Sequence, residues 1–246
     1  MSCRLIEPVV DSYGRTDLPT SLIRAGRPFL PAAERQLEPS LRSAAVRLTS
    51  GSRDAVMLPE LPLPVGVPDM TAVVLNKGAV SRRIATGVPP ILGFRKSAVV
   101  AACGARKPTT LQRLMAVTGV SERQTRDTVG DLVRSGALIR SGSGWCRSEV
   151  IAPIGRVFAL EAKVSDWRGG FAQSLKYSLY ADSVTLVLGR IGSKAIDAAR
   201  GACADQGVGL VVDGTWLVRP RLHKVPLARR LQCSEQILAV LVHQAI

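Results

Sequence analysis

One stretch of the sequence, residues 157–180, constrains the fold more than any other; it reads VFALEAKVSDWRGGFAQSLKYSLY. Its first seven residues form a short apolar run that begins with a β-branched and an aromatic residue and precedes a turn-prone Ser-Asp pair, which predicts a buried strand. Because strand side chains alternate between faces, Glu161 and Lys163 share one face. The other face of this strand carries Phe158, Leu160 and Ala162.

The residues after that strand predict an amphipathic helix with two stripes. Phe171, Leu175 and Leu179 recur at every fourth position and predict a packed apolar stripe. Gln173 and Tyr177 form a second stripe one turn apart. A Gln-Tyr line that faces the strand could reach the acid and amine there, although an ordinary polar flank of a helix gives the same pattern.

The segment Glu161-Ala162-Lys163, followed by Gln173-Ser174-Leu175-Lys176-Tyr177, resembles the second half of the PD-(D/E)xK nuclease superfamily, particularly its RecB-like members with a QxxxY helix. That family also carries an earlier acid at a strand turn, and Pro68-Asp69 supplies one immediately before an apolar run over 70–75. The family usually joins these motifs through a short hairpin, whereas Asp69 and Glu161 lie 92 positions apart. A segment must therefore be inserted between them.

The resemblance implies a metal site and a hydrolytic reaction. Asp69 and Glu161 would hold Mg²⁺ or Mn²⁺, since carboxylate oxygens suit these ions, and the metal would activate a water that attacks a phosphodiester. Lys163 would orient or activate that water, or stabilise charge in the transition state. Gln173 and Tyr177 would support the site or touch the substrate. The alternatives are an ordinary ion pair between Glu161 and Lys163 and a turn-forming role for Asp69.

The inserted segment has a pattern of its own. Apolar spacing predicts a helix over 96–103 and a second over 109–119, which ends at Gly119. The S-x-x-Q pattern of a capping box begins at Ser121 and predicts a third helix to about residue 135. Residues 136–145 then read as a strand, a glycine-rich turn and a returning strand. Three helices and a hairpin in this order resemble a winged helix-turn-helix.

The third of these helices would lie in the major groove of DNA. Residues 95–148 contain ten Lys or Arg and three acids, which accounts for half of the chain's net charge of +14. That excess predicts salt-sensitive binding to a phosphate backbone, although a winged helix used for protein contacts is the alternative. The residues predicted to contact DNA are Arg113, Arg123, Gln124, Arg126, Arg134 and Arg140. The third helix is expected to bury Val129, Leu132 and Val133 and to expose Thr125.

Composition narrows the function classes further. The chain has 33 Lys or Arg against 19 Asp or Glu and a pI near 10.5, which favours anionic partners such as nucleic acid. Five scattered cysteines predict reduced thiols, and two histidines argue against a histidine-based metal site. No apolar run is long enough to span a bilayer and no signal-peptide core is present, so a cytoplasmic protein with no membrane partner is expected.

The remaining segments alternate between strand and helix patterns. We predict an α/β fold with a mixed central sheet flanked by helices, a restriction-endonuclease-like core, and an inserted winged-helix domain. The expected divisions are an N-terminal arm over 1–30, a core over 31–80 and 151–246, and the insertion over 81–150. A terminal helix or helix pair over 226–246 caps the core or forms a homodimer face. Glu34 and Glu38, before an early helix at 41–48, are expected to be solvated.

Together these patterns predict a metal-dependent DNA nuclease that hydrolyses phosphodiester bonds and holds DNA with its winged helix. The alternative is a non-enzymatic DNA-binding regulator, or an adaptor, built on a degenerate nuclease fold.

Overall fold

The computed structural model describes residues 16–17, 32–52 and 54–243. The predicted arm over 1–30 therefore lies outside the described residues, apart from a two-residue strand at Thr16–Asp17. The contacts divide the chain into two compact units. The sheet unit holds the described residues up to Leu75 together with Gly155–Val225, and the helical unit holds Asn76–Ile154 together with the described residues from Pro226 onward.

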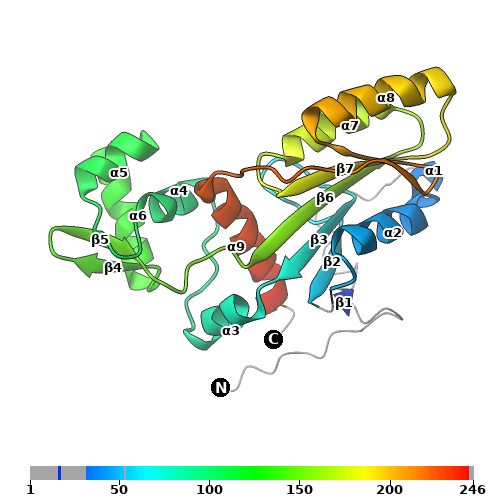
Figure 1. Cartoon of the computed structure of the whole chain (residues 1–246). Coiled ribbons are helices and arrows are strands. Elements are labelled where there is room, and N and C mark those ends of the chain that lie inside the picture. Colours follow the sequence, from blue (N-terminus) through cyan, green and yellow to red (C-terminus); the bar gives the residue numbers. More distant parts are fainter. Residues whose placement is uncertain (1–15, 18–31, 53, 244–246) are drawn as a thin grey trace. The chain divides into compact units, whose positions relative to one another are not determined.

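The sheet unit is built on a mixed seven-stranded sheet with the order β1-β2-β3-β6-β7-β8-β9 (Figure 1). Strands β6, β7 and β8 run parallel to one another. Strand β3 pairs antiparallel with β2 on one side and with β6 on the other, and β8 pairs antiparallel with β9. The strands are β1 (Thr16–Asp17), β2 (Ala55–Pro59), β3 (Met70–Leu75), β6 (Gly155–Lys163), β7 (Ser183–Leu188), β8 (Gly209–Val212) and β9 (Thr215–Val218). The helices are α1 (Ala32–Arg35), α2 (Glu38–Leu48), α7 (Trp167–Tyr177) and α8 (Ser193–Gln206).

Helices cover both faces of this sheet, with α2 on one side and α7 and α8 on the other (Figure 1). The α2 side is apolar because β6 turns alternate residues toward that helix. Its core cluster includes Phe158, Leu160 and Ala162 from β6 and Leu41, Ala44 and Ala45 from α2. The predicted α/β fold with a mixed sheet flanked by helices is confirmed.

Helix α7 buries a different face from the predicted apolar stripe, although Tyr177 of the second stripe is buried. Its buried residues are Gly170, Ser174 and Tyr177, whereas Leu179, predicted to pack, is 48% exposed. A Cβ atom on Gly170 would lie 2.6 Å from Leu186 Cδ1 and 2.8 Å from Lys163 Cγ. The small residues of α7 therefore set how closely the helix lies against β6 and β7, which the spacing of its large apolar residues does not reveal.

The helical unit is inserted between two neighbouring strands. Strands β3 and β6 pair antiparallel, and Leu75, where β3 ends, pairs with Gly155, where β6 begins. The chain therefore leaves the sheet and returns to it at adjacent strand ends, where a simple sheet would have a tight hairpin turn. This topology accounts for the long separation of Asp69 from Glu161 in the sequence.

The helical unit comprises five helices and a hairpin among the described residues. They are α3 (Lys77–Ala85), α4 (Phe94–Ala102), α5 (Leu111–Thr118), α6 (Glu122–Arg134), β4 (Leu138–Ser141), β5 (Gly144–Arg147) and α9 (Leu227–His243). Gly119 ends α5 in the left-handed conformation, as predicted, with φ of 66°. Their common core draws residues from α4, α5, α6, β4 and α9, among them Val99, Leu114, Leu132, Leu138 and Leu231.

Three details of this unit differ from the sequence-based expectations. Ser121 precedes α6 as expected, but its side chain makes no capping hydrogen bond. Thr125 is buried and Val133 is 38% exposed, the reverse of the prediction. Burial of Thr125 leaves no polar group unsatisfied, because its hydroxyl donates to the Ser121 carbonyl at 2.8 Å. The segment from 226 onward, expected in the core, supplies α9 to the helical unit.

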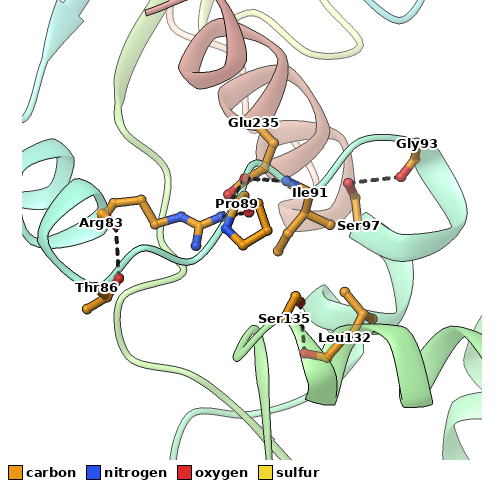
Figure 2. Close-up of polar contacts among 9 residues, drawn as sticks. All are labelled: Arg83, Thr86, Pro89, Ile91, Gly93, Ser97, Leu132, Ser135 and Glu235. Carbon is orange, nitrogen blue, oxygen red and sulfur yellow. Dashed lines mark hydrogen bonds and ion pairs between the residues drawn. The ribbon is translucent and has the colours of Figure 1, made fainter. Parts of the chain in front are cut away.

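A buried ion pair ties α9 to the start of the helical unit (Figure 2). Arg83 Nη2 lies 2.8 Å from Glu235 Oε2 and also donates to the Pro89 carbonyl at 2.8 Å. The Ile91 N–H donates to the same Glu235 oxygen at 2.7 Å. The two charged side chains are only 2% and 1% exposed. One carboxylate thus joins α3, the segment at 89–91 and α9.

We expect Glu235→Ala to lower the free energy of unfolding by about 3–5 kcal/mol, because it leaves the Arg83 charge buried without its partner. Urea unfolding followed by circular dichroism measures the loss. The matched control is Glu122→Ala, which removes an exposed ion pair with Arg126 in the same unit and should cost less than about 1 kcal/mol. Equal losses in the two variants would show that the buried pair has no special role.

Candidate functional site

Asp69 lies against the strand that carries the other predicted acid. It immediately precedes β3, and since Met70 pairs with Leu160, the register places Asp69 beside Glu161. The Ala162 N–H donates to Asp69 Oδ2 at 2.7 Å, and the residue is only 7% exposed. Two acids that are 92 positions apart in the sequence therefore lie side by side, one just before β3 and the other on β6.

Glu161 and Lys163 lie on the same face of β6, as strand alternation predicted. Glu161 is completely buried, and its Oε1 lies 2.8 Å from Lys163 Nζ. The Lys163 side chain is 13% exposed, so the lysine is less deeply buried than Glu161. A buried carboxylate without a partner would cost a large desolvation free energy, and the lysine charge offsets part of that cost.

Helix α7 contributes Tyr177 to the same cluster. The Tyr177 hydroxyl lies 3.0 Å from Glu161 Oε2 and 3.2 Å from the carbonyl oxygen of Val67, so it can donate to either. Tyr177 therefore contacts both the buried acid and the loop that leads to Asp69. Gln173 lies one turn earlier on α7 and is partly buried, but it takes no part in these contacts.

A third acid, Glu34 of α1, joins the site although the sequence analysis set it aside as solvated. Its Oε1 lies 3.5 Å from Lys163 Nζ, and its side chain is only 15% exposed. Glu38, four residues later, is exposed and pairs with Arg42, as a solvated charge would. In the sequence, both Glu34 and Glu38 simply precede an early helix. Nothing local in the sequence indicates that Glu34 is the one that contacts Lys163.

Burial and mutual repulsion perturb the ionisation of this cluster. The pKa of Asp69 is raised from 3.8 to about 7, first by burial and then by the charge of Glu161. Burial alone would lower the pKa of Lys163, but the hydrogen bond and charge of Glu161, with the charges of Asp69 and Glu34, raise it overall. Lys163 is therefore a stable ammonium at neutral pH, and one lysine faces three acids.

The donor set of this cluster fits a hard divalent cation. Asp69, just before β3, and Glu161, on β6, offer carboxylate oxygens, and Mg²⁺ commonly takes one or two carboxylates together with waters and substrate phosphate. Across the described residues, no group of three or more His, Cys, Asp or Glu is arranged to hold a metal ion. Glu34 instead faces Lys163, so two carboxylates are the protein's contribution to such a site.

The six residues predicted to bind DNA all belong to the helical unit and are exposed. Arg113 lies on α5, Arg140 on β4, and the other four on α6. Two of the α6 residues are engaged by acids of the same helix. Arg126 pairs with Glu122, and Arg134 pairs with Asp131.

Comparisons with protein families, curated proteins and solved structures found no match to this chain. Within the described ranges, no helix combines the length and the apolar character needed to cross a membrane.

The raised pKa of Asp69 gives a test that is independent of activity. The pKa of this carboxyl is 3.8 in the unfolded chain and about 7 in the folded protein. The free energy of unfolding therefore falls as the pH rises between these two values. We expect Asp69→Asn to stabilise the metal-free protein by on the order of 2 kcal/mol at pH 8, with the gain shrinking toward pH 4.

Urea unfolding in EDTA at several pH values measures this gain. Asp197→Asn, at an exposed position on α8, is the matched control for the removal of one carboxylate. Added Mg²⁺ should stabilise the wild-type chain more than Asp69→Asn. If Asp69→Asn is less stable than wild type at pH 8, the Asp69 carboxylate stabilises the metal-free fold, which would contradict this prediction.

Proposed function

We propose that this chain is a metal-dependent nuclease that hydrolyses phosphodiester bonds in DNA. The observation that carries the proposal is the convergence of Asp69, Glu161 and Lys163 in one buried cluster on adjacent strands. Burying two acids and an amine together costs desolvation free energy, and one of the acids is 92 positions away in the sequence. A functional site gives a reason for that cost. A restriction-endonuclease-like core is the architecture that we propose for the sheet unit.

Each residue of the cluster has a distinct role in this proposal. Asp69 and Glu161 would bind Mg²⁺ or Mn²⁺, which when bound supplies an acidified water and offsets phosphate charge. Lys163 would act as a cation beside the scissile phosphate, where it stabilises the charge that develops on the phosphoryl oxygens. Its raised pKa favours this role over that of a general base. Tyr177 would orient Glu161, and Gln173 would support the site or touch the substrate.

Glu34 would position Lys163. In the cluster as it stands, the ammonium lies closest to Glu161, which is also an expected metal ligand. A cation that takes Glu161 oxygens would compete with that contact, and Glu34 is then the other acid within ion-pair distance of the lysine among the described residues. Glu34 would keep Lys163 charged and in place while Glu161 serves the metal.

We also propose that the helical unit binds DNA as a winged helix-turn-helix. Helices α4, α5 and α6 followed by the β4–β5 hairpin support this reading, together with the strong excess of basic residues over 95–148. Helix α9, which packs into the same core, would be an addition to that three-helix plan.

One observation favours the non-catalytic alternative. Lys163 and Tyr177 contact both carboxylate oxygens of Glu161, and a purely structural ion pair would look the same. A DNA-binding regulator or adaptor with a degenerate nuclease core would then keep the cluster for stability. Divalent-metal binding by the purified chain, with and without DNA, separates the two functions.

We expect Glu161→Ala to reduce cleavage of DNA with Mg²⁺ or Mn²⁺ by at least about 100-fold, because it removes a metal ligand and the partner of Lys163. DNA binding, measured in EDTA, should be unchanged. Because Glu161 is buried, Glu161→Gln is tested alongside as the variant that preserves shape. Glu38→Gln, an exposed acid of the same unit, is the control. Cutting that survives undiminished in both Glu161 variants would reject the nuclease assignment.

The role of Glu34 is tested with Glu34→Gln. Losing its charge should lower the pKa of Lys163, which NMR of the lysine side chain detects in the metal-free protein. Cleavage should fall by roughly 10-fold, as for a residue that orients the active group. Affinity for Mn²⁺ should change much less than in Asp69→Asn. An equal loss of Mn²⁺ affinity in both variants would instead identify Glu34 as a metal ligand.

A further inference from the structure

The basic charge of the helical unit is distributed unevenly. Residues 95–148 hold ten Lys or Arg and three acids, and all three acids lie on α6. Helix α6 also carries three arginines, so its formal charge is zero. The whole excess of seven positive charges in this segment therefore lies outside the helix that was predicted to enter the major groove.

Ion pairs reduce the attraction of α6 for a polyanion further. Arg126 Nη2 lies 2.7 Å from Glu122 Oε1. Asp131 is paired with Arg134 and also lies 3.5 Å from Lys96 Nζ. A cation beside a carboxylate projects a weaker field than an isolated one. A phosphate that approached these arginines would also meet the neighbouring acids.

A second group of cations comes from the hairpin and from residues 106–113. Arg106, Lys107, Arg113 and Arg140 are all exposed, and none of them takes part in an ion pair among the described residues. We call these four residues the hairpin basic surface. No acid occurs over 95–121 or over 135–148, the two stretches that supply them.

Backbone pairing brings these stretches together. Thr109 exchanges two hydrogen bonds with Trp145 of β5, at 2.9 and 3.1 Å, and Trp145 pairs on its other side with Arg140 of β4. The Arg147 N–H donates to the Gly104 carbonyl at 2.9 Å. Residues 105–108, which include Arg106 and Lys107, therefore lie between two backbone contacts with β5.

The approach of this segment to β5 is close. A Cβ atom on Gly144 would lie 2.6 Å from the Thr109 carbonyl oxygen. The next residue, Thr110, caps α5, because its side chain accepts from the Arg113 N–H. The first turn of α5 therefore follows directly after Thr109, which is bonded to β5. All four cations therefore lie on the hairpin or within four residues of backbone that is hydrogen-bonded to it.

We infer that the hairpin basic surface makes the main contacts to the phosphate backbone of a nucleic acid, whereas α6 contributes little net electrostatic attraction. The inference rests on the proposed DNA binding and deepens it by naming the surface. The partner is an extended polyanion, because the four cations are exposed and spread over three segments, and a small anion would be held in a buried pocket. Arg106 and Lys107 are residues that the sequence analysis did not select.

The test uses the full chain and a fluorescent DNA duplex in EDTA, with affinity measured by anisotropy between about 50 and 200 mM salt. Each phosphate contact contributes about −0.9 to the slope of log K against log salt. We expect Arg106→Gln with Lys107→Gln to make the slope shallower by about 1–2. The matched control, Arg126→Gln with Arg134→Gln, removes the same charge and should change the slope by less than half as much.

Circular dichroism establishes that both double variants are folded. An equal or larger change in the α6 variant would overturn the inference, as would an unchanged slope in the Arg106 and Lys107 variant. If the wild-type chain fails to bind DNA at low salt, the proposed DNA binding fails, and the inference fails with it. The first two outcomes leave DNA binding intact, so the two failures are distinguishable.

Discussion

The antiparallel pairing of β3 with β6 is the constraint on which the candidate site depends. It sets Asp69 beside Glu161, and the Ala162 N–H fixes the Asp69 carboxylate at 2.7 Å. Two carboxylates in a buried position repel each other and lose hydration, so the arrangement costs stability. The raised pKa of Asp69 reflects that cost. Lys163 offsets only part of that cost, and the proposed cation would offset more of it.

The same pairing explains how the chain accommodates a second unit. Leu75 and Gly155 pair at adjacent strand ends, so residues 76–154 can depart and return without disturbing the register that unites the acids. The C-terminal α9 completes the helical unit and is secured there by the buried Arg83–Glu235 pair. Each unit therefore contains segments from separate parts of the sequence, and the two proposed functions reside in separate units.

Local features of this fold could be predicted from the sequence, whereas contacts between distant segments largely could not. The β6 strand, the shared face of Glu161 and Lys163, and the turn at Gly119 all follow from short-range periodicity. The pairing of Asp69 with Glu161 required the family resemblance, because nothing local links them. Glu34 was missed because its partner is 129 positions away. The buried face of α7 was misjudged because close packing of small residues outweighed the stripe of large ones.

The central claim is that Asp69 and Glu161 share one divalent cation. The most direct measurement is anomalous diffraction from crystals of the protein grown or soaked with Mn²⁺. We expect a Mn²⁺ peak within coordination distance of both carboxylates, with Lys163 beside it. If Mn²⁺ occupies other sites fully, none lies between the two carboxylates, and Lys163 keeps its contact with Glu161, the shared-cation claim is contradicted.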